Sequence, residues 1–235
     1  MDEFLTDEQQ ADRARNWLRT NGVFIAAGVV LGLGGLFGWQ QWQNYQTRIA
    51  GEASVVWEQL RGAVEGKRFS EVDETLARLE KDYARTPYLD QARLLLAQME
   101  MDRNAPDEAI AQLQLLVKSG DDPQLRRVGE LRLAQVLAYQ GKYDEALAAL
   151  GSKDETAFAS LYHDQRGDIL FSQGQFEDAA SEYELALAAD EYGAIDRAYV
   201  QIKLDDVKGS IETMAAGNSE APAAETPEST VAGKD

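Results

Sequence analysis

The feature that most constrains this chain is a long charge-free segment near its N-terminus. Residues 20–47 contain no Asp, Glu, Lys or Arg, and residues 23–39 read VFIAAGVVLGLGGLFGW. Extended to Trp42, the run of about 20 residues would measure roughly 30 Å as an α-helix, the thickness of a bilayer's hydrocarbon core. Trp17 precedes the run and Trp39 and Trp42 end it, as in the aromatic belts of membrane helices. The sequence therefore predicts a transmembrane helix over residues 22–42.

The residues that flank this run predict how it sits in the membrane. The preceding segment is long and acidic and no small-x-small cleavage signal follows, so a retained signal-anchor is expected rather than a cleaved leader. Arg13, Arg15 and Arg19 precede the run, whereas only Arg48 follows it before residue 61. The positive-inside bias then places residues 1–21 in the cytoplasm and residues 43–235 outside it, in the periplasm of a Gram-negative bacterium. The alternative topology, with the C-terminal part in the cytoplasm, stays open.

Glycines recur within the apolar run. Gly28 and Gly32 have small-xxx-small spacing, and Gly35 lies close to the same helix face. Because glycine lets a neighbouring helix approach closely, these three residues are candidates for packing on another membrane helix. The competing interpretation is that glycine is simply common in membrane helices.

The chain after residue 50 has the composition of an all-α protein, and Pro residues mark where its helices are expected to begin. Ala, Leu, Glu, Gln and Arg dominate, and alternating β-branched runs are absent. Thr86-Pro87, Ala105-Pro106 and Asp122-Pro123 each place Pro where a first helical turn would begin. Thr86 and Asp122 are also suitable N-caps, so helices are expected to begin at these points.

Two segments of this helical region resemble each other. Residues 131–150 read LRLAQVLAYQGKYDEALAAL, and residues 164–187 read DQRGDILFSQGQFEDAASEYELAL. With Gly141 aligned on Gly174, small, large, glycine, aromatic and alanine positions coincide at a shift of 33 residues. This order and period are typical of tetratricopeptide repeats, in which two helices cross closely at the small residues.

The repeat pattern sets the expected organisation. Weaker copies lie at residues 91–116 and 55–85, the latter with Phe69, Leu76 and Leu79 inward. Residues 192–207 would add a last helix with Tyr199, Ile202 and Leu204 covering the stack. The predicted fold is therefore all-α, a transmembrane helix followed by a tetratricopeptide-repeat-like solenoid of three to four hairpins over residues 43–208. Residues 209–235 are rich in small residues, Pro and Glu, and are expected to be a disordered acidic tail.

Composition excludes most kinds of chemistry. The net charge is −18, which argues against nucleic-acid binding, and the chain has no Cys and a single His. His163, near Asp164 and Asp168, is expected to be a partly exposed helix residue. The two acids share a helix face at i, i+4 spacing, which is more often a solvated or groove-lining face than a metal site. No enzyme activity, metal, cofactor or small-molecule substrate is predicted, because no nucleophile has a matching base.

Binding is the remaining function. In tetratricopeptide arcs the first helix of each hairpin forms the concave face, where an extended peptide or a partner helix can dock. Mapping the repeats onto that geometry gives six candidate residues, which are Gln98, Met101, Gln135, Tyr139, Asp168 and Phe171. The competing interpretation is that these side chains only pack against neighbouring hairpins.

The combination of anchor and repeats resembles the YfgM-type ancillary subunits of the SecYEG translocon. The resemblance rests on NWLRTNGVFIAAGVVLGLGGLFGWQQW, the two repeat segments above and the closing YVQIKLDDV, and spans roughly residues 5–207. It implies a single-pass protein of the bacterial inner membrane whose periplasmic repeats associate with the SecYEG translocon. It also implies a membrane-anchored prolyl-isomerase-type chaperone as a second partner in protein export. An adaptor for another envelope-assembly or cell-division complex is the alternative.

Overall fold

The computed structural model describes residues 7–151, 157–190 and 193–219, and within these ranges the chain is helical, without strands. The predicted all-α class is confirmed. The helices are α1 (Asp7–Glu65), α2 (Phe69–Asp82), α3 (Pro87–Asp102), α4 (Pro106–Ser119), α5 (Pro123–Tyr139), α6 (Tyr143–Leu150), α7 (Ala159–Ser172), α8 (Phe176–Ala189) and α9 (Arg197–Ser219).

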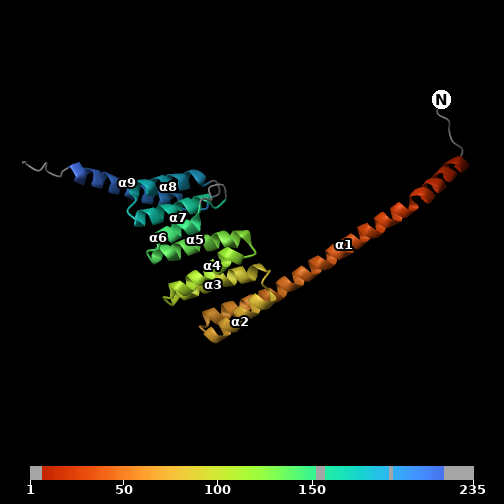
Figure 1. The fold of residues 1–235 in the computed structure, drawn as a ribbon, viewed down its shortest axis with the longest axis horizontal. Coiled ribbons are helices and arrows are strands. Elements are labelled where there is room, and N and C mark those ends of the chain that lie inside the picture. Colours follow the sequence, from red (N-terminus) through yellow and green to blue (C-terminus); the bar gives the residue numbers. More distant parts are fainter. Residues whose placement is uncertain (1–6, 152–156, 191–192, 220–235) are drawn as a thin grey trace, which may run out of the picture.

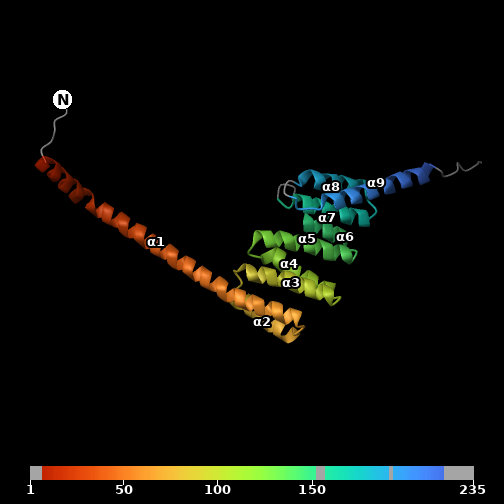
Figure 2. The same cartoon turned by 180° about the vertical axis from the view of Figure 1, so that it is seen from behind.

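Successive helices pair into hairpins that stack side by side (Figures 1 and 2). The end of α1 pairs with α2, α3 with α4, α5 with α6 and α7 with α8, and α9 packs on α8 at the end of the stack. The first helices of the pairs also contact one another, α1 with α3, α3 with α5 and α5 with α7. These contacts make an inner layer, and the four hairpins agree with the upper end of the predicted range.

Helix α1 is both the apolar segment and the first helix of the first hairpin. Its N-terminal part stands clear of the stack (Figure 1), and its C-terminal part is buried against α2 and α3 through Ala53, Val56, Leu60 and Ala63. The spacing of these four residues presents one apolar face, which is what a helix docked on a core requires. No break in the helix separates the predicted segments 22–42 and 43–208, so the repeat stack begins on the same helix as the apolar run.

The turn inside each hairpin has one recurrent geometry. Its central residue has a positive φ in all four hairpins, at Lys67 (54°), Asn104 (59°), Gly141 (75°) and Gly174 (76°). The following backbone N–H bonds a carbonyl five residues earlier, as from Lys142 to Leu137 at 2.9 Å. This left-handed conformation favours Gly and tolerates Asn. The turn residue is therefore a clear sequence signal in the last two hairpins, where it is Gly, and a weak one in the first two, where it is Lys or Asn.

The two predicted N-caps behave differently. Asp122 accepts hydrogen bonds from the backbone N–H of Gln124 at 2.7 Å and of Leu125 at 3.3 Å, as expected of an N-cap. Thr86 occupies the N-cap position of α3 as predicted, but its hydroxyl donates to the Tyr83 carbonyl at 2.7 Å and makes no capping hydrogen bond to α3. The hydroxyl is a donor as well as an acceptor, and here it satisfies the end of the preceding helix instead.

Two expectations at the ends of the stack also need correction. In the first hairpin Leu79 is buried as predicted, but Phe69 is 41% exposed, with the Arg103 guanidinium 4.4 Å from its ring centroid. In α9 Leu204 is buried, whereas Tyr199 and Ile202 are exposed, because the helix turns a different face, with Val200 and Val207, toward α8.

Helix α9 continues past the expected boundary at residue 208. It ends at Ser219, so residues 209–219 are helical rather than part of a disordered tail. The rest of the predicted tail, residues 220–235, lies outside the described residues.

Candidate partner-binding groove

The inner layer of the stack is hollowed between α1, α3 and α5. This groove has a volume of about 700 Å³. Its lining residues come from the first helices of three successive hairpins and from α4, and they are Trp57, Gln91, Leu94, Leu95, Ala97, Gln98, Met101, Leu113, Val128, Arg132, Gln135, Val136 and Tyr139. Most of these side chains are apolar, with amides and one guanidinium among them.

Four of the six predicted binding residues line this groove. Gln98 and Met101 lie one turn apart on α3, and Gln135 and Tyr139 lie one turn apart on α5. Tyr139 is 67% exposed, so its ring is available to a partner rather than packed on the next hairpin. The structure thus brings these four residues to one surface, and their role in binding remains a prediction.

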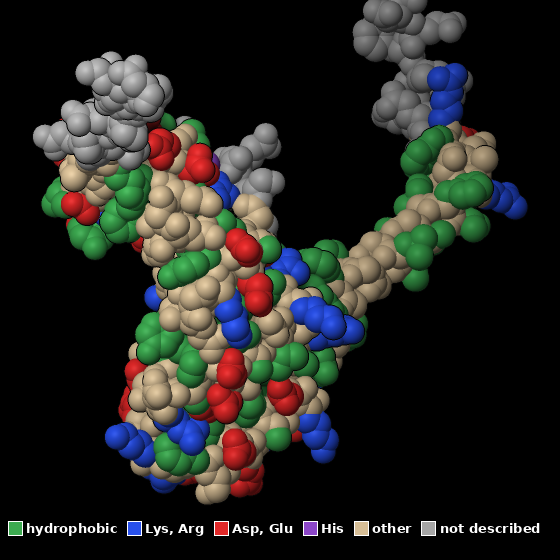
Figure 3. Space-filling view, turned by 60° about the vertical axis from the view of Figure 1, so that its left-hand side comes forward, with side chains coloured by type: hydrophobic (Ala, Val, Ile, Leu, Met, Phe, Trp, Pro, Cys, Tyr) green, Lys and Arg blue, Asp and Glu red, His purple; other side chains and the backbone are tan. Residues whose placement is uncertain are grey.

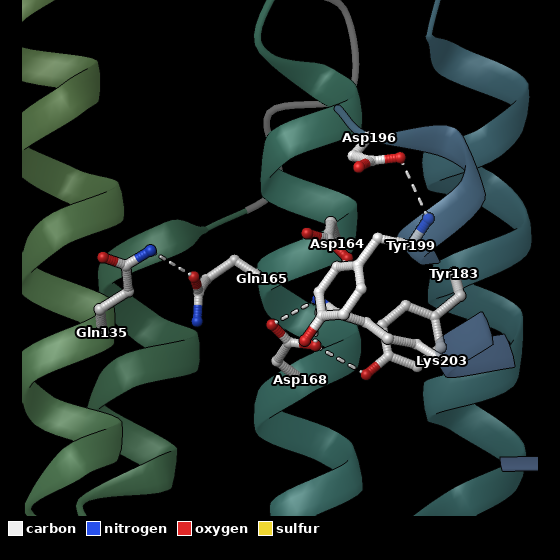
Figure 4. Close-up of polar contacts among 8 residues, drawn as sticks. All are labelled: Gln135, Asp164, Gln165, Asp168, Tyr183, Asp196, Tyr199 and Lys203. Atoms are coloured by element: carbon white, nitrogen blue, oxygen red, sulfur yellow. Dashed lines mark hydrogen bonds and ion pairs between the residues drawn. The ribbon is translucent and has the colours of Figure 1, made fainter. Parts of the chain in front are cut away.

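The other two predicted residues lie outside the groove, on α7. The Phe171 ring packs edge-on against Phe176, with 5.4 Å between ring centroids, and keeps 36% of its surface exposed. Asp168 is engaged within the stack (Figure 4): its carboxylate accepts a hydrogen bond from the Tyr183 hydroxyl at 2.8 Å and lies 2.7 Å from the Lys203 Nζ.

Lys203 also explains the acidic pair that the sequence shows at residues 164 and 168. Its ammonium lies 2.9 Å from Asp164 Oδ1, so one cation from α9 bridges both carboxylates of α7. Burial raises the pKa of Asp164 despite its hydrogen bond to Lys203. Burial opposes the charge on Lys203, but the two carboxylates outweigh it and raise the pKa of this amine. The ion pair therefore joins α9 to the stack.

The exposure of His163 differs from that predicted from the sequence. It is 5% exposed, not partly exposed, and its Nδ1 lies 2.8 Å from Glu182 Oε2, an oxygen that also accepts from the Arg166 Nε at 3.0 Å. Such a charged cluster fixes α7 against α8. Within the ranges that the structure describes, no group of three or more His, Asp or Glu side chains could hold a metal ion.

Trp57 and Arg132 also line the groove, although neither was predicted from the sequence. Trp57 occupies the same place before the turn residue Lys67 as Leu94 does before Asn104. That equivalence is visible only once Lys67 is recognised as a turn residue, and a lysine gives no such signal. Arg132 lies one turn before Gln135 on α5, so its place on the same face was available from helical spacing.

A second, smaller hollow of about 460 Å³ adjoins the groove near the first hairpin turn. It shares Leu95 and Gln98 with the groove and extends toward Lys67, Phe69 and Arg103. The two hollows together run along the inner surface of the first three hairpins.

The predicted glycine face lies on the free part of α1. At Gly28, Gly32 and Gly35 an added Cβ atom would meet no described atom within 4 Å. By length and composition α1 could cross a membrane, and none of its most apolar window is buried within the chain. Figure 3 shows its apolar side chains standing away from the stack. Packing of another helix on these glycines remains a prediction.

Comparisons with known proteins agree with this architecture. The family model described as "Tetratricopeptide repeat-like domain" matches residues 15–209. The chain is 31% identical to the "Ancillary SecYEG translocon subunit" of Escherichia coli (strain K12), over 88% of this chain and 99% of that protein. A protein of the same name from Neisseria gonorrhoeae is 29% identical, over 87% and 98% of the two chains.

Among solved structures, BtubC (BKLC) from P. vanneervenii matches with a TM-score of 0.45 and 18% identity, over 80% of this chain and 98% of that chain. The matching family model covers most of the helices described above, and the curated relatives align over nearly their whole length. The chain therefore belongs to the tetratricopeptide repeat-like family, together with the proteins named ancillary SecYEG translocon subunits.

Proposed function

We propose that this chain is a non-enzymatic scaffold of the bacterial inner membrane that associates with the SecYEG translocon and links it to a membrane-anchored prolyl-isomerase-type chaperone. The observation that carries the proposal is the continuity of α1, which joins an apolar segment long enough to cross a bilayer to the first hairpin of a repeat stack. The names of the relatives supply the translocon as the partner.

The anchor gives the scaffold its advantage. A groove held beside a membrane complex meets its partner at a high effective concentration, so a weak contact becomes sufficient. On the proposed topology the repeats are periplasmic, because Arg13, Arg15 and Arg19 precede the apolar run and only Arg48 follows it closely. The chaperone link and the periplasmic side both rest on the resemblance and on this charge bias.

Copurification from membranes tests the association. The full chain carries an affinity tag and is solubilised in mild detergent, and SecY and the anchored prolyl isomerase are detected with antibodies. We expect both proteins to copurify. Failure to recover SecY with a folded bait would overturn the proposal, and recovery of cell-division proteins in its place would favour the alternative adaptor function.

A reporter fusion tests the topology separately. Alkaline phosphatase fused after Ser219, where α9 ends, is expected to be active because it would be exported. A fluorescent protein that folds only in the cytoplasm, fused at the same residue, is expected to stay dark. The reverse pattern would place the stack in the cytoplasm and contradict the proposed partners.

A further inference from the structure

Arg132 is the one charged side chain among those that line the groove between α1, α3 and α5. Its Nη1 donates to the Gln135 Oε1 at 3.0 Å, and among the described residues it has no carboxylate partner within ion-pair distance. A guanidinium carries five N–H donors, so most of this capacity is left for a ligand. Arg132 is thus an exposed cation at the groove, in a chain of net charge −18.

Gln135 holds Arg132 in place. While its Oε1 accepts from Arg132, its Nε2 donates to the Gln165 Oε1 of α7 at 2.8 Å (Figure 4). The amide is therefore fixed at both ends, and its oxygen is directed at the guanidinium. This relay orients a cation on α5 by means of a contact with the next hairpin.

The rest of the groove suits apolar side chains. Five of the large side chains that line it with Arg132 are apolar or aromatic, namely Trp57, Leu94, Leu95, Met101 and the exposed Tyr139. Aromatic and Met side chains supply large contact areas and adapt to partners of different shape. The lining thus fits an apolar segment, and the single cation fits one negative charge within it.

The groove also lies close to the apolar part of α1. Trp57 follows Trp42 on the same helix, so at about 1.5 Å per residue it lies roughly 22 Å further along the axis. Segments that flank the membrane helix of a neighbouring protein can reach a surface at this height. A segment anchored in the same membrane meets the groove at a high effective concentration, which favours it over a freely diffusing partner.

We propose that the groove binds an apolar segment that carries one carboxylate, supplied by the region next to the membrane helix of a second anchored protein. This inference rests on the proposed function, because it requires the stack to stand beside a membrane complex. The carboxylate pairs with Arg132, and the apolar side chains on either side of it contact Trp57 and Tyr139.

Matched synthetic peptides test the charge preference. The full chain is reconstituted in nanodiscs of zwitterionic phosphatidylcholine, and empty nanodiscs serve as the blank. Three fluorescein-labelled peptides share one Leu- and Ala-rich sequence and carry Glu, Gln or Lys at the central position. We expect the Glu peptide to bind about two- to fivefold more tightly than the Lys peptide, the upper part of the range measured for exposed charge pairs.

Charge reversal then identifies the cation. Arg132→Glu is expected to invert the preference, so that the Lys peptide binds more tightly. Arg78→Glu on α2 makes the same change in net charge at an exposed position outside the groove and is expected to leave the preference unchanged. Circular dichroism confirms that both variants keep the helical fold. Equal binding of the three peptides, absence of binding to the folded protein, or an unchanged preference in Arg132→Glu would each overturn the inference.

The outcome is separable from that of the proposed function. If SecY copurifies but the peptides show no charge preference, only the assignment of the groove fails. If the Glu peptide is preferred but SecY is not recovered, the charge preference of the groove holds, but the translocon association fails and with it the assignment of the occupant to a neighbour in that complex.

Discussion

Gly167 lies directly against the ring of Tyr183, where α7 crosses α8. A Cβ atom at Gly167 would lie 2.5 Å from Tyr183 Cε1, closer than packed atoms tolerate. In the preceding hairpin the equivalent pair is Ala134 and Leu150, both buried. The larger ring in one repeat is thus matched by the smaller residue opposite it, which keeps the distance between the helices similar along the stack.

Gly167→Ala is therefore expected to destabilise the stack. Overpacking of this kind costs about 1–3 kcal/mol in the free energy of unfolding, because Tyr183 is buried and cannot move aside freely. Urea denaturation followed by circular dichroism measures the loss. Gly209→Ala on α9, where an added Cβ meets nothing within 4 Å, is the control and is expected to be neutral or slightly stabilising. Combining Gly167→Ala with Tyr183→Leu should recover part of the loss, and strict additivity of the two changes would contradict this account of the crossing.

At the first hairpin turn, a substitution is expected to stabilise the stack. Lys67 has a φ of 54°, a conformation that costs side-chain-bearing residues about 1–2 kcal/mol. We expect Lys67→Gly to raise the free energy of unfolding by about 0.5–1 kcal/mol, since part of the relief is offset by the greater freedom of glycine when unfolded. Asn104→Gly should gain less, because Asn tolerates this region. Lys67→Ala separates the effects: it removes the same side-chain functional group without relieving the backbone, and a gain equal to that of Lys67→Gly would refute the explanation.

A hairpin could be predicted from the sequence where its turn holds a residue that favours the left-handed conformation, above all Gly. Gly141 and Gly174 revealed the last two hairpins and their repeat shift, and Pro106 and Pro123 marked the start of helices. The first hairpin was placed only approximately, because Lys67 gives no sign of a left-handed turn. Without that alignment Trp57 could not be assigned to the concave face.

Other features depend on contacts that leave no periodic signal. Asp168 was expected in the binding surface by its repeat position, but its partner Lys203 lies 35 residues further along the chain. Helical spacing gives no information about such a pair. The extension of α9 to Ser219 was missed for a different reason, because beyond Ile211, which packs on the same cluster as Val207, the segment is rich in small residues and gives only a weak apolar pattern.

The bridge between α7 and α9 predicts unequal roles for its two carboxylates. Asp168 accepts hydrogen bonds from both Lys203 and the Tyr183 hydroxyl, whereas Asp164 accepts only from Lys203. Burial also disfavours the charged form of Asp164. Asp168→Asn is expected to lower the free energy of unfolding by about 1–3 kcal/mol, and Asp164→Asn by less. Thermal denaturation of the two isosteric variants at neutral pH compares them. A larger loss for Asp164→Asn would show that the ion pair outweighs the cost of burying the carboxylate.

The pH dependence of Asp164 is expected to be opposite to that of an ordinary salt bridge. Because its pKa is raised in the folded state, the folded chain holds this proton more tightly than the unfolded chain. Protonation of Asp164 therefore stabilises the wild type as the pH falls, and it does nothing for Asp164→Asn. We expect the stability difference between wild type and Asp164→Asn to grow as the pH falls through the raised pKa of Asp164 toward the ordinary carboxyl pKa of about 4. A difference that shrinks on acidification would indicate a lowered pKa and contradict the assignment.

The continuity of α1 predicts that the stack is held at a defined orientation to the apolar segment. The chain has no Cys, so two cysteines introduced at Gln43 and Ser119 can carry spin labels without background. We expect a narrow distance distribution in nanodiscs by pulsed electron paramagnetic resonance. Gln46→Pro removes a helical hydrogen bond and kinks the helix at a cost of about 3 kcal/mol, which should broaden the distribution while the stack stays folded. Gln46→Ala is expected to keep it narrow. An equally broad distribution in the unmodified helix would mean that the stack swings freely and that the height of the groove is not set by α1.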